Sequence, residues 1–233
     1  MKNKLLISVL LLVHNFAFGQ SNTIAQFAIW KPKEGQAQAF EIGYKQHLNW
    51  HETNADTWSW YGWYIVSGSR YGQFVDATFD HAWADFDNVV KPAEDMADNK
   101  LHVFPFGDLQ TVFKVSLLPK ISINDTFSNK LKIVRLVTID VQNMNSAIKL
   151  IQELKSFYVL NKIKSFKVYK LIDGGLVKQL ILMLGFSTWE EYSVSETLNE
   201  KIEEIEKSQN TETILSINSE TIIYRADMSL FPK

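Results

Sequence analysis

The sequence predicts an α+β protein built from two tandem copies of one strand-helix-strand-strand-helix-strand (βαββαβ) unit. The first observation is an internal repeat. Residues 73–86 align without a gap on residues 179–192, a shift of 106 positions that superposes Trp83 on Trp189. The second observation is that alternating apolar patterns, typical of strands, and 3.6-residue patterns, typical of helices, follow in the same order in both copies. Together they indicate a duplicated chain.

The first copy is placed at residues 20–120. A Pro- and Gly-containing turn at residues 31–35 separates the first strand from a long helix, and Ser67-Gly68-Ser69 separates the second strand from the third. We interpret residues 92–107, which are rich in Pro, Asp and aromatic residues, as a loop. The expected elements are a strand at residues 23–30, a helix at 36–52, strands at 58–66 and 72–79, a helix at 82–89 and a strand at 109–117.

The second copy, residues 121–233, repeats this order after a linker expected at residues 119–129. Asp173-Gly174-Gly175 is a hairpin turn signal. Ser187-Thr188-Trp189-Glu190 has the Ser-x-x-Glu spacing of a capping box, which predicts the start of a short helix. The expected elements are a strand at residues 132–141, a helix at 146–160, strands at 165–172 and 177–186, a helix from 188 and a strand at 221–226.

This order, present twice, is the ferredoxin-like plan. Two such sheets can pack as a barrel covered by helices, which buries more apolar surface than either small unit alone. At the strand-to-helix junctions, residues 79–86 and 185–192, the sequence resembles the dimeric α+β barrel superfamily, in particular its antibiotic-biosynthesis-monooxygenase-like proteins. The resemblance implies two tandem ferredoxin-like repeats packed as an intramolecular α+β barrel. It also implies a monomer or weak oligomer, because the usual homodimer would be fused into one chain.

The resemblance further implies a class of activity. Some members of the superfamily degrade haem with an Asn, a Trp and a His around the cofactor, and others oxidise polycyclic substrates without a metal. These residues do not carry over one by one, since the expected first strand has no Asn in its body and Trp60 or Trp83 with His81 does not reproduce the order. No catalytic residue is therefore assigned and no cofactor is predicted; haem is the cofactor that the resemblance leaves open.

Residues 1–19 have the pattern of a signal peptide. Lys2 and Lys4 precede a short apolar core at residues 5–13, and Ala17-Phe18-Gly19 forms a small-x-small cleavage site. We expect an exported protein, periplasmic or secreted, without a membrane span, because the apolar core is about half of the roughly 20 residues that a span needs. With 24 Lys and Arg against 26 Asp and Glu, and no Cys, the composition excludes a strongly basic nucleic-acid binder, a disulfide scaffold and a thiolate metal site.

The two copies differ in chemistry. All four histidines outside the predicted signal peptide lie in the first copy, together with six of the seven tryptophans. In the third strand of that copy, Asp76 and Thr78 stand where the second copy has Leu182 and Leu184. If this face is buried, Asp76 needs partners and is a candidate base or ligand anchor. The alternative is a face that is simply exposed to water in the first copy.

The helix expected at residues 36–52 carries a pair of histidines. His47 and His51 are four residues apart and fall within the apolar stripe that contains Phe40 and Tyr44. This spacing lets one helix present two imidazoles to a metal, but no Glu follows the first His as it does in metalloproteases. A hydrogen-bonded, partly buried pair is the interpretation we favour. Metal or haem ligation and acid-base chemistry are the alternatives, and no metal is predicted.

The densest feature of the chain is the aromatic run at residues 58–64. As a strand it would present Trp60 and Tyr64 on one face and Tyr61 and Trp63 on the other. Such a surface could hold a flat ligand by stacking, or it could form an aromatic core and barrel interface. Both interpretations stay open.

The sequence therefore favours an exported protein that binds a small aromatic or cyclic ligand in a pocket of the first copy. The alternatives are a monooxygenase-like or haem-linked enzyme at the same pocket, and a structural or interaction protein without a pocket. The candidate ligand-binding residues are His47, His51, Trp60, Tyr64, Asp76, Thr78 and His81.

Overall fold

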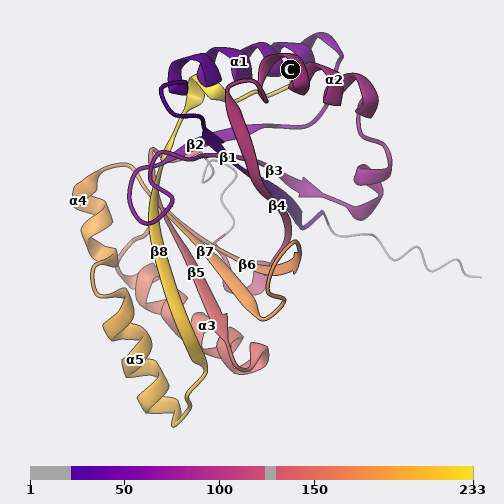
Figure 1. Ribbon diagram of the computed structural model, residues 1–233. Coiled ribbons are helices and arrows are strands. Elements are labelled where there is room, and N and C mark those ends of the chain that lie inside the picture. Colours follow the sequence, from indigo (N-terminus) through magenta and orange to yellow (C-terminus); the bar gives the residue numbers. More distant parts are fainter. Residues whose placement is uncertain (1–21, 124–129, 233) are drawn as a thin grey trace, which may run out of the picture.

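The computed structural model describes residues 22–123 and 130–232. The predicted signal peptide and part of the predicted linker lie outside these residues. The described strands form one closed barrel in the order β1-β3-β2-β8-β5-β7-β6-β4 (Figure 1), and every neighbouring pair is antiparallel. The strands are β1 (Ile24–Pro32), β2 (Tyr61–Ile65), β3 (Phe74–His81), β4 (Gly107–Leu117), β5 (Ile133–Val141), β6 (Ser165–Asp173), β7 (Gln179–Phe186) and β8 (Ile214–Tyr224).

The barrel consists of two four-stranded halves, which correspond to the two copies in the sequence. The first half contains β1 to β4 and the second half β5 to β8. The halves join at two equivalent places, because the second strand of each copy pairs with the last strand of the other: β2 with β8, and β6 with β4. The prediction of two tandem ferredoxin-like repeats that form an α+β barrel within one chain is therefore confirmed.

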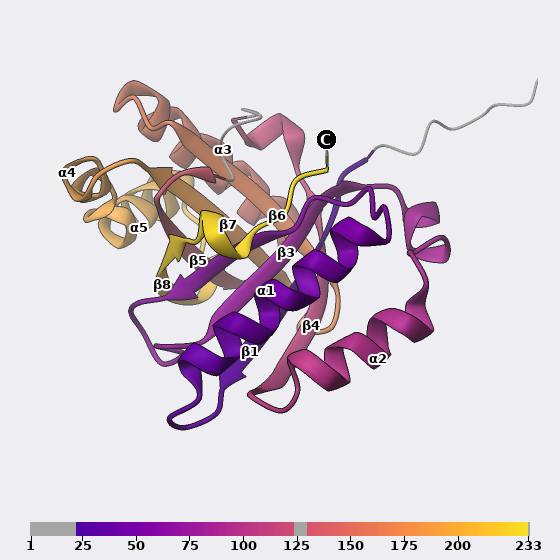
Figure 2. The same cartoon turned by 90° about the horizontal axis from the view of Figure 1, so that it is seen from above.

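Helices cover the outside of the barrel. Those of the first half, α1 and α2, lie on one side of the molecule, and those of the second half lie on another (Figures 1 and 2). No helix among the described residues is long and apolar enough to cross a membrane. The α-helices are α1 (Ala37–Thr53), α2 (Pro92–His102), α3 (Met144–Leu160), α4 (Trp189–Tyr192) and α5 (Leu198–Gln209).

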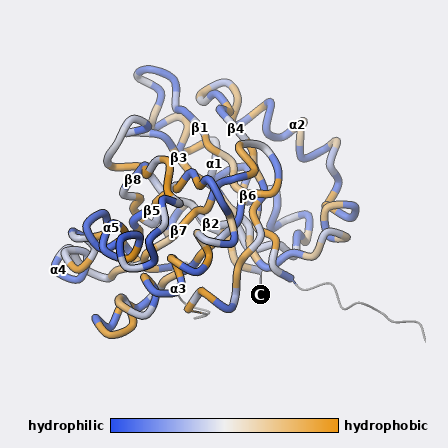
Figure 3. The backbone as a smooth tube through the Cα atoms, turned by 90° about the horizontal axis from the view of Figure 1, so that it is seen from below, coloured by the Kyte–Doolittle hydropathy of each residue, from blue (hydrophilic) through white to orange (hydrophobic). Residues whose placement is uncertain are grey.

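Three apolar clusters hold these layers together. The barrel interior combines both halves, with Phe27 and Trp63 from one and Leu136 and Ile181 from the other. A second cluster lies between the first half and its helices, and a third between the second half and its helices. Hydrophobic residues follow the strands, whereas hydrophilic residues predominate on α5 (Figure 3). Strands such as β3 and β7 thus bury both faces, one in the barrel and one beneath a helix, whereas much of β4 and of the first part of β8 is exposed.

The expected loop at residues 92–107 is wrong, because most of it forms α2. Pro92 occupies the first turn of α2, where its missing N–H costs nothing. Glu94 and Asp95 also lie in the first turn, and Lys100 and His102 in the last, so these charges match the helix dipole. The Pro and Asp residues that suggested a loop are helix-start signals.

Other element boundaries also differ from the expectation. The helix expected at residues 82–89 is a single 3₁₀ segment, η1 (Trp83–Asp87), and the helix expected from residue 188 is divided into α4 and α5. The last strand begins at residue 214 rather than 221, because its polar first part pairs with β5. The cap of α4 is shifted by one residue. Thr188 Oγ1 accepts from the backbone N–H of Glu191 at 3.2 Å, and the Glu191 carboxylate accepts from that of Ser187 at 2.7 Å.

Candidate functional site

Helix α1 turns one face toward the sheet, and its histidines lie on that face. Only 5% of the surface of His47 and 2% of that of His51 is exposed, which confirms that both lie in the buried stripe. Gly43 on the same helix lets α2 approach closely, since a Cβ at this position would lie 1.8 Å from the carbonyl oxygen of His102. The packing of α1 against α2 therefore sets the geometry of the site.

Three potential ligand atoms converge where α1 meets α2. Nε2 of His47 and Nε2 of His51 are 3.1 Å apart. Asp95 lies in the first turn of α2, and its Oδ1 is 3.3 Å from Nε2 of His47 and 3.7 Å from Nε2 of His51. We refer to His47, His51 and Asp95 as the histidine cluster. Its histidines are neighbours because residues four apart share one face of a helix.

A carboxylate also lies beside the Nδ1 atom of each imidazole ring. Nδ1 of His47 lies 2.7 Å from Oδ2 of Asp98, and this hydrogen bond makes Nδ1 the protonated nitrogen of a neutral ring. Nδ1 of His51 lies 2.8 Å from Oδ2 of Asp56, a close contact outside hydrogen-bond direction. The same oxygen of Asp56 accepts a hydrogen bond from Trp60 Nε1 at 2.9 Å. Nε2 of His47 therefore directs a lone pair into the cluster.

Helix α2 supplies two further polar side chains. Nδ2 of Asn99 lies 3.0 Å from Nε2 of His47 and 3.2 Å from Oδ1 of Asp95. Oδ1 of Asn99 is buried and has no hydrogen-bond partner among the described residues. Nδ1 of His102 lies 2.9 Å from Oδ1 of Asp98, and the Asp98 carboxylate is therefore held between the imidazoles of His47 and His102. The cluster is thus enclosed by a continuous polar network.

Burial dominates the electrostatics of this network. It lowers the pKa of His47 despite the opposing hydrogen bond to Asp98, and it raises the pKa of Asp95 despite the nearby histidines. Burial also acts to raise the pKa of Asp56, but contacts with His51 and hydrogen bonds from neighbouring donors outweigh it and lower that pKa. His47 is therefore held as a neutral imidazole near neutral pH.

Asp76 lies on the same face of the sheet but outside the histidine cluster. It accepts a hydrogen bond from Trp30 Nε1 at 2.9 Å, and the Tyr44 hydroxyl also interacts with it. Burial raises the pKa of Asp76 to about 7, against the lowering effect of these donors. Thr78, two residues further along β3, is buried, and its hydroxyl has no partner among the described residues. The face that carries both residues is therefore covered rather than wet.

The remaining candidate residues lie in two places. Trp60 packs on His51 with ring centroids 4.4 Å apart, and Tyr64 packs on Phe74 at 5.3 Å, so both face the α1 side of the sheet as expected. His81 lies elsewhere, at the far end of β3, with its ring 4.1 Å from that of Trp58. The structure thus brings six of the seven candidates onto one side of the sheet, and places His81 apart from them beside a shallow concavity.

Aromatic side chains of the chain itself fill the space beneath α1. The rings of Tyr44 and Phe74 are 4.7 Å apart, and Phe40 contacts both Phe74 and Trp30 at 5.7 and 6.2 Å. A haem ligated by His47 or His51 would have to occupy this same space between the sheet and α1, because both histidines lie on the buried face of α1. The residues present do not fit a haem there, and no role is derived through one. Contact between these seven candidate residues and a ligand remains a prediction.

Sequence reasoning missed the carboxylates that complete the cluster. Asp95 and Asp98, together with the amide of Asn99, lie within the segment expected to be a loop, and a loop implies no shared face for them. Asp56 follows α1 in a loop and carries no distinguishing pattern. Recognition of Pro92 as a helix start would have placed Asp95 and Asn99 four residues apart on one face.

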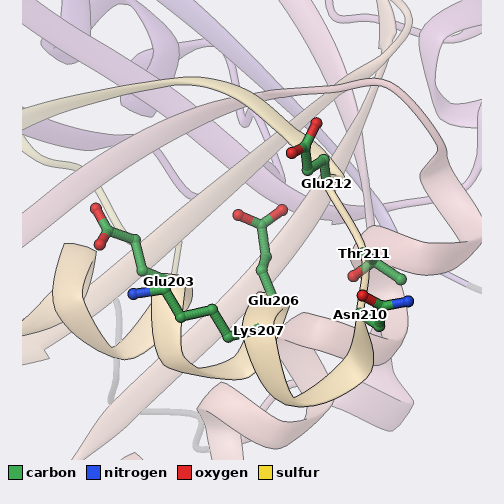
Figure 4. Close-up of a pocket in the computed structure, with 6 residues that line it drawn as sticks. All are labelled: Glu203, Glu206, Lys207, Asn210, Thr211 and Glu212. Carbon is green, nitrogen blue, oxygen red and sulfur yellow. The ribbon is translucent and has the colours of Figure 1, made fainter.

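Other concavities lie on the surface. One of about 620 Å³ follows the end of α5 (Figure 4) and is lined by charged and polar residues. Its Glu206 accepts from the backbone N–H of Thr213 and Ile214 at 2.6 and 2.9 Å, so this side chain secures the turn into β8. We interpret that concavity as structural. A groove between α1 and α2 and a pocket at one mouth of the barrel have more varied linings.

The fold places the chain in a recognisable structural class, the dimeric α+β barrel. No protein-family model matches the chain, and no curated protein matches its sequence. Solved structures match it over most of its length. One is a protein of Lactobacillus acidophilus described as a "putative monooxygenase", with a TM-score of 0.61, 12% identity, and coverage of 90% of this chain and 96% of that one.

Two other matches extend this class. A variant of the chlorite dismutase of Candidatus Nitrospira defluvii has a TM-score of 0.59 at 8% identity, covering 89% of this chain and 93% of its own. An anthrone oxidase-like protein has a TM-score of 0.51 at 10% identity, covering 88% and 92%. The chain therefore has the fold of chlorite dismutases and of these oxidase- and monooxygenase-like proteins. At such identities the likeness is one of fold, and function must come from the site.

Proposed function

We propose that the chain is an exported protein that binds a small aromatic or cyclic ligand, and that its first half supplies the site. The observation that carries this proposal is an open groove of about 600 Å³ between α1 and α2. The groove is lined by Ile42, Lys45, Gln46, Asn49, Trp50, Thr53, Asp98 and His102.

The lining combines a stacking surface with polar groups. Trp50 packs nearly parallel to His47, with ring centroids 6.1 Å apart and an angle of 10° between the planes, so the indole is held in place from beneath. Ile42 adds exposed apolar surface, while Lys45 and His102 can hydrogen-bond a ligand. A cyclic molecule could stack on the indole and direct its polar groups to these side chains.

Ligand titration tests the proposal directly. Purified protein is titrated with indole, a phenol and a monosaccharide while Trp fluorescence is followed. We expect saturable binding of at least one probe, and its loss in Trp50→Ala. Trp83→Ala is the matched control, because Trp83 is an exposed tryptophan of the same half outside the groove. Binding that survives Trp50→Ala would contradict the groove.

A second location has its own support. At one mouth of the barrel, a pocket of about 260 Å³ has an apolar floor that includes Phe27, Phe113 and Ile181, and a polar rim that includes Thr111 and Gln179. Barrel mouths are frequent ligand sites. Binding lost in Phe113→Ala but kept in Trp50→Ala would place the ligand there.

Each alternative function suggested by the sequence predicts a different experimental result. A monooxygenase-like enzyme would consume oxygen when its ligand is bound, whereas a binding protein would not. Absence of binding by every probe would favour an interaction protein. Oxygen uptake measured beside the fluorescence titration therefore separates the three functions.

A further inference from the structure

The histidine cluster has the dimensions of a metal site. Around a tetrahedral zinc-like ion, nitrogen and oxygen ligands lie about 2.0–2.2 Å from the metal, so neighbouring ligand atoms are separated by about 3.3–3.6 Å. The three edges of the cluster measure 3.1, 3.3 and 3.7 Å. The donor atoms of His47, His51 and Asp95 are therefore spaced closely enough to share one ion after little or no movement.

Proton positions in the cluster favour a cation at its centre. Because Nδ1 of His47 donates to Asp98, Nε2 of His47 presents a lone pair to Nε2 of His51. Nε2 of His51 lies in hydrogen-bond contact with that lone pair, and Oδ1 of Asp95 lies beside both nitrogens. Such an arrangement is repulsive unless a proton or a metal ion lies between the atoms.

The surroundings follow the pattern of ligand support in metalloproteins. Metal-binding histidines generally donate their second ring N–H to a carboxylate or carbonyl, which orients the ring. His47 donates to Asp98 in this way, whereas Oδ2 of Asp56 lies 2.8 Å from Nδ1 of His51 outside hydrogen-bond direction. Three carboxylates near two imidazoles also leave an excess of negative charge that a dication would offset. The network described above is thus organised around the centre of the cluster.

We propose that His47, His51 and Asp95 bind a divalent first-row transition-metal ion such as Zn²⁺. Two imidazoles and one carboxylate suit such ions better than Ca²⁺ or Mg²⁺, which prefer oxygen ligands. Rotation of the Asn99 amide would bring Oδ1 to the position of Nδ2, beside His47 and Asp95, and offer a fourth ligand. About one third of the Asp95 side chain is exposed, which gives the ion access from solvent.

This inference departs from the sequence-based expectation of no metal, because the sequence alone does not place Asp95 beside His47 and His51. The groove and the histidine cluster share Asp98, but metal binding and probe binding are measured separately, so either proposal can fail without the other. The competing explanation is a proton-sharing network that only clamps α2 onto α1. That explanation predicts no specific affinity for a metal.

The test is a titration of metal-stripped, full-length mature protein with Zn²⁺ by calorimetry, and with Co²⁺ by its visible absorption. We expect one ion per chain, and no comparable binding of Ca²⁺ or Mg²⁺. Asp95→Asn and His51→Gln should each lower Zn²⁺ affinity at least 100-fold. Asp98→Asn, which removes support rather than a ligand, should lower it about 10- to 100-fold.

Asp85→Asn and His81→Gln are the matched controls. These two residues form another His–Asp pair of the first half, with 3.7 Å between Nδ1 of His81 and Oδ2 of Asp85, and they lie outside the histidine cluster. Both should bind Zn²⁺ as the wild-type protein does. Circular dichroism establishes that each variant is folded; if His51→Gln does not fold, the two Asp variants decide. No saturable binding by the wild-type protein, or unchanged affinity in Asp95→Asn and Asp98→Asn, would overturn the proposal.

Discussion

The two halves of the barrel share one backbone plan but bury different chemistry beneath their helices. Leu182 and Leu184 of β7 are fully buried in the apolar cluster under α3 and α5. At the corresponding positions of β3, Asp76 and Thr78 are also buried, among aromatic rings and polar groups. The inner faces of these two strands are apolar in both halves.

This difference shows which surface of the fold is free to diverge. Successive side chains of a strand point to opposite faces, so the outer face can change while the inner face keeps packing the barrel. The barrel interior is shared by both halves and needs apolar residues from each. The space beneath α1 is formed mainly by the first half, with Met228 and Leu230 added from the C-terminal segment. Polar residues are tolerated there when partners such as Trp30 compensate for their burial.

The largest expected effect comes from replacing a buried leucine of the second half by an aspartate, at the position that corresponds to Asp76 in the first half. In Leu182→Asp, the loss of a buried leucine costs about 2–5 kcal/mol, and a carboxyl without partners adds to that cost. Because the total stability of a domain is about 5–15 kcal/mol, we expect this variant to be largely unfolded. Urea unfolding followed by circular dichroism measures the change.

Leu215→Asp makes the same chemical change at an exposed position of the second half. Its free energy of unfolding should stay within about 0.5 kcal/mol of the wild-type value. A stable Leu182→Asp protein would show that the second half, too, accommodates polar groups, and the contrast between the halves would lose its physical basis.

The next effect depends on pH and concerns Asp76. Its pKa is raised to about 7 by burial, so between about pH 4 and 7 the folded chain keeps a proton that the unfolded chain has lost. Stability is therefore lost as pH rises through this range, by up to about 4 kcal/mol at roughly 1.4 kcal/mol per pH unit. Asp76→Asn should remove this loss and unfold at a higher urea concentration than wild type at pH 8, but not at pH 4.

Asp140 provides a control of opposite sign. Hydrogen bonds from Ser216 and Gln179 lower its pKa, so its contribution is present at neutral pH and is lost as pH falls through the acidic range. Asp140→Asn should therefore be less stable than wild type at neutral pH and nearly as stable as wild type at low pH, where the wild-type protein has already lost this contribution. A difference between Asp76→Asn and wild type that does not vary with pH would mean that Asp76 is ionised in the folded chain.

The smallest effect concerns the two equivalent helix starts that follow β3 and β7. Thr188 caps α4 through its hydroxyl, whereas the matching Ala82 has no side chain to cap η1. Thr188→Ala should cost about 1 kcal/mol of stability. Ala82→Thr should stabilise the chain by a fraction of that, because Ala82 already has the extended backbone of a cap residue.

Thermal unfolding of both variants measures these changes. Thr211→Ala serves as a comparison, because it deletes a hydroxyl that has no hydrogen-bond partner among the described residues. If Thr188→Ala has no larger effect than Thr211→Ala, the hydroxyl does not cap the helix, and the two junctions are energetically equivalent.

Features that depend on interactions between nearby residues could be predicted from the sequence, whereas features that depend on distant segments could not. Short-range periodicity placed all eight strands and the inward face of α1, including His47 and His51. The segment from Pro92 was misinterpreted because Pro and Asp occur both in loops and at helix starts. The polar first part of β8 was missed because its strand character depends on pairing with β5, which local pattern does not reveal.

By itself, the sequence determined the duplication, the α+β barrel, and the half in which histidines and tryptophans are concentrated. These follow from composition and from periodicities that act over a few residues. Only the tertiary structure decided that Asp95 meets His47 and His51, because that meeting depends on how closely α2 packs on α1 at Gly43. It also decided that rings of the chain itself occupy the space beneath α1, since packing there is determined by side chains from distant segments.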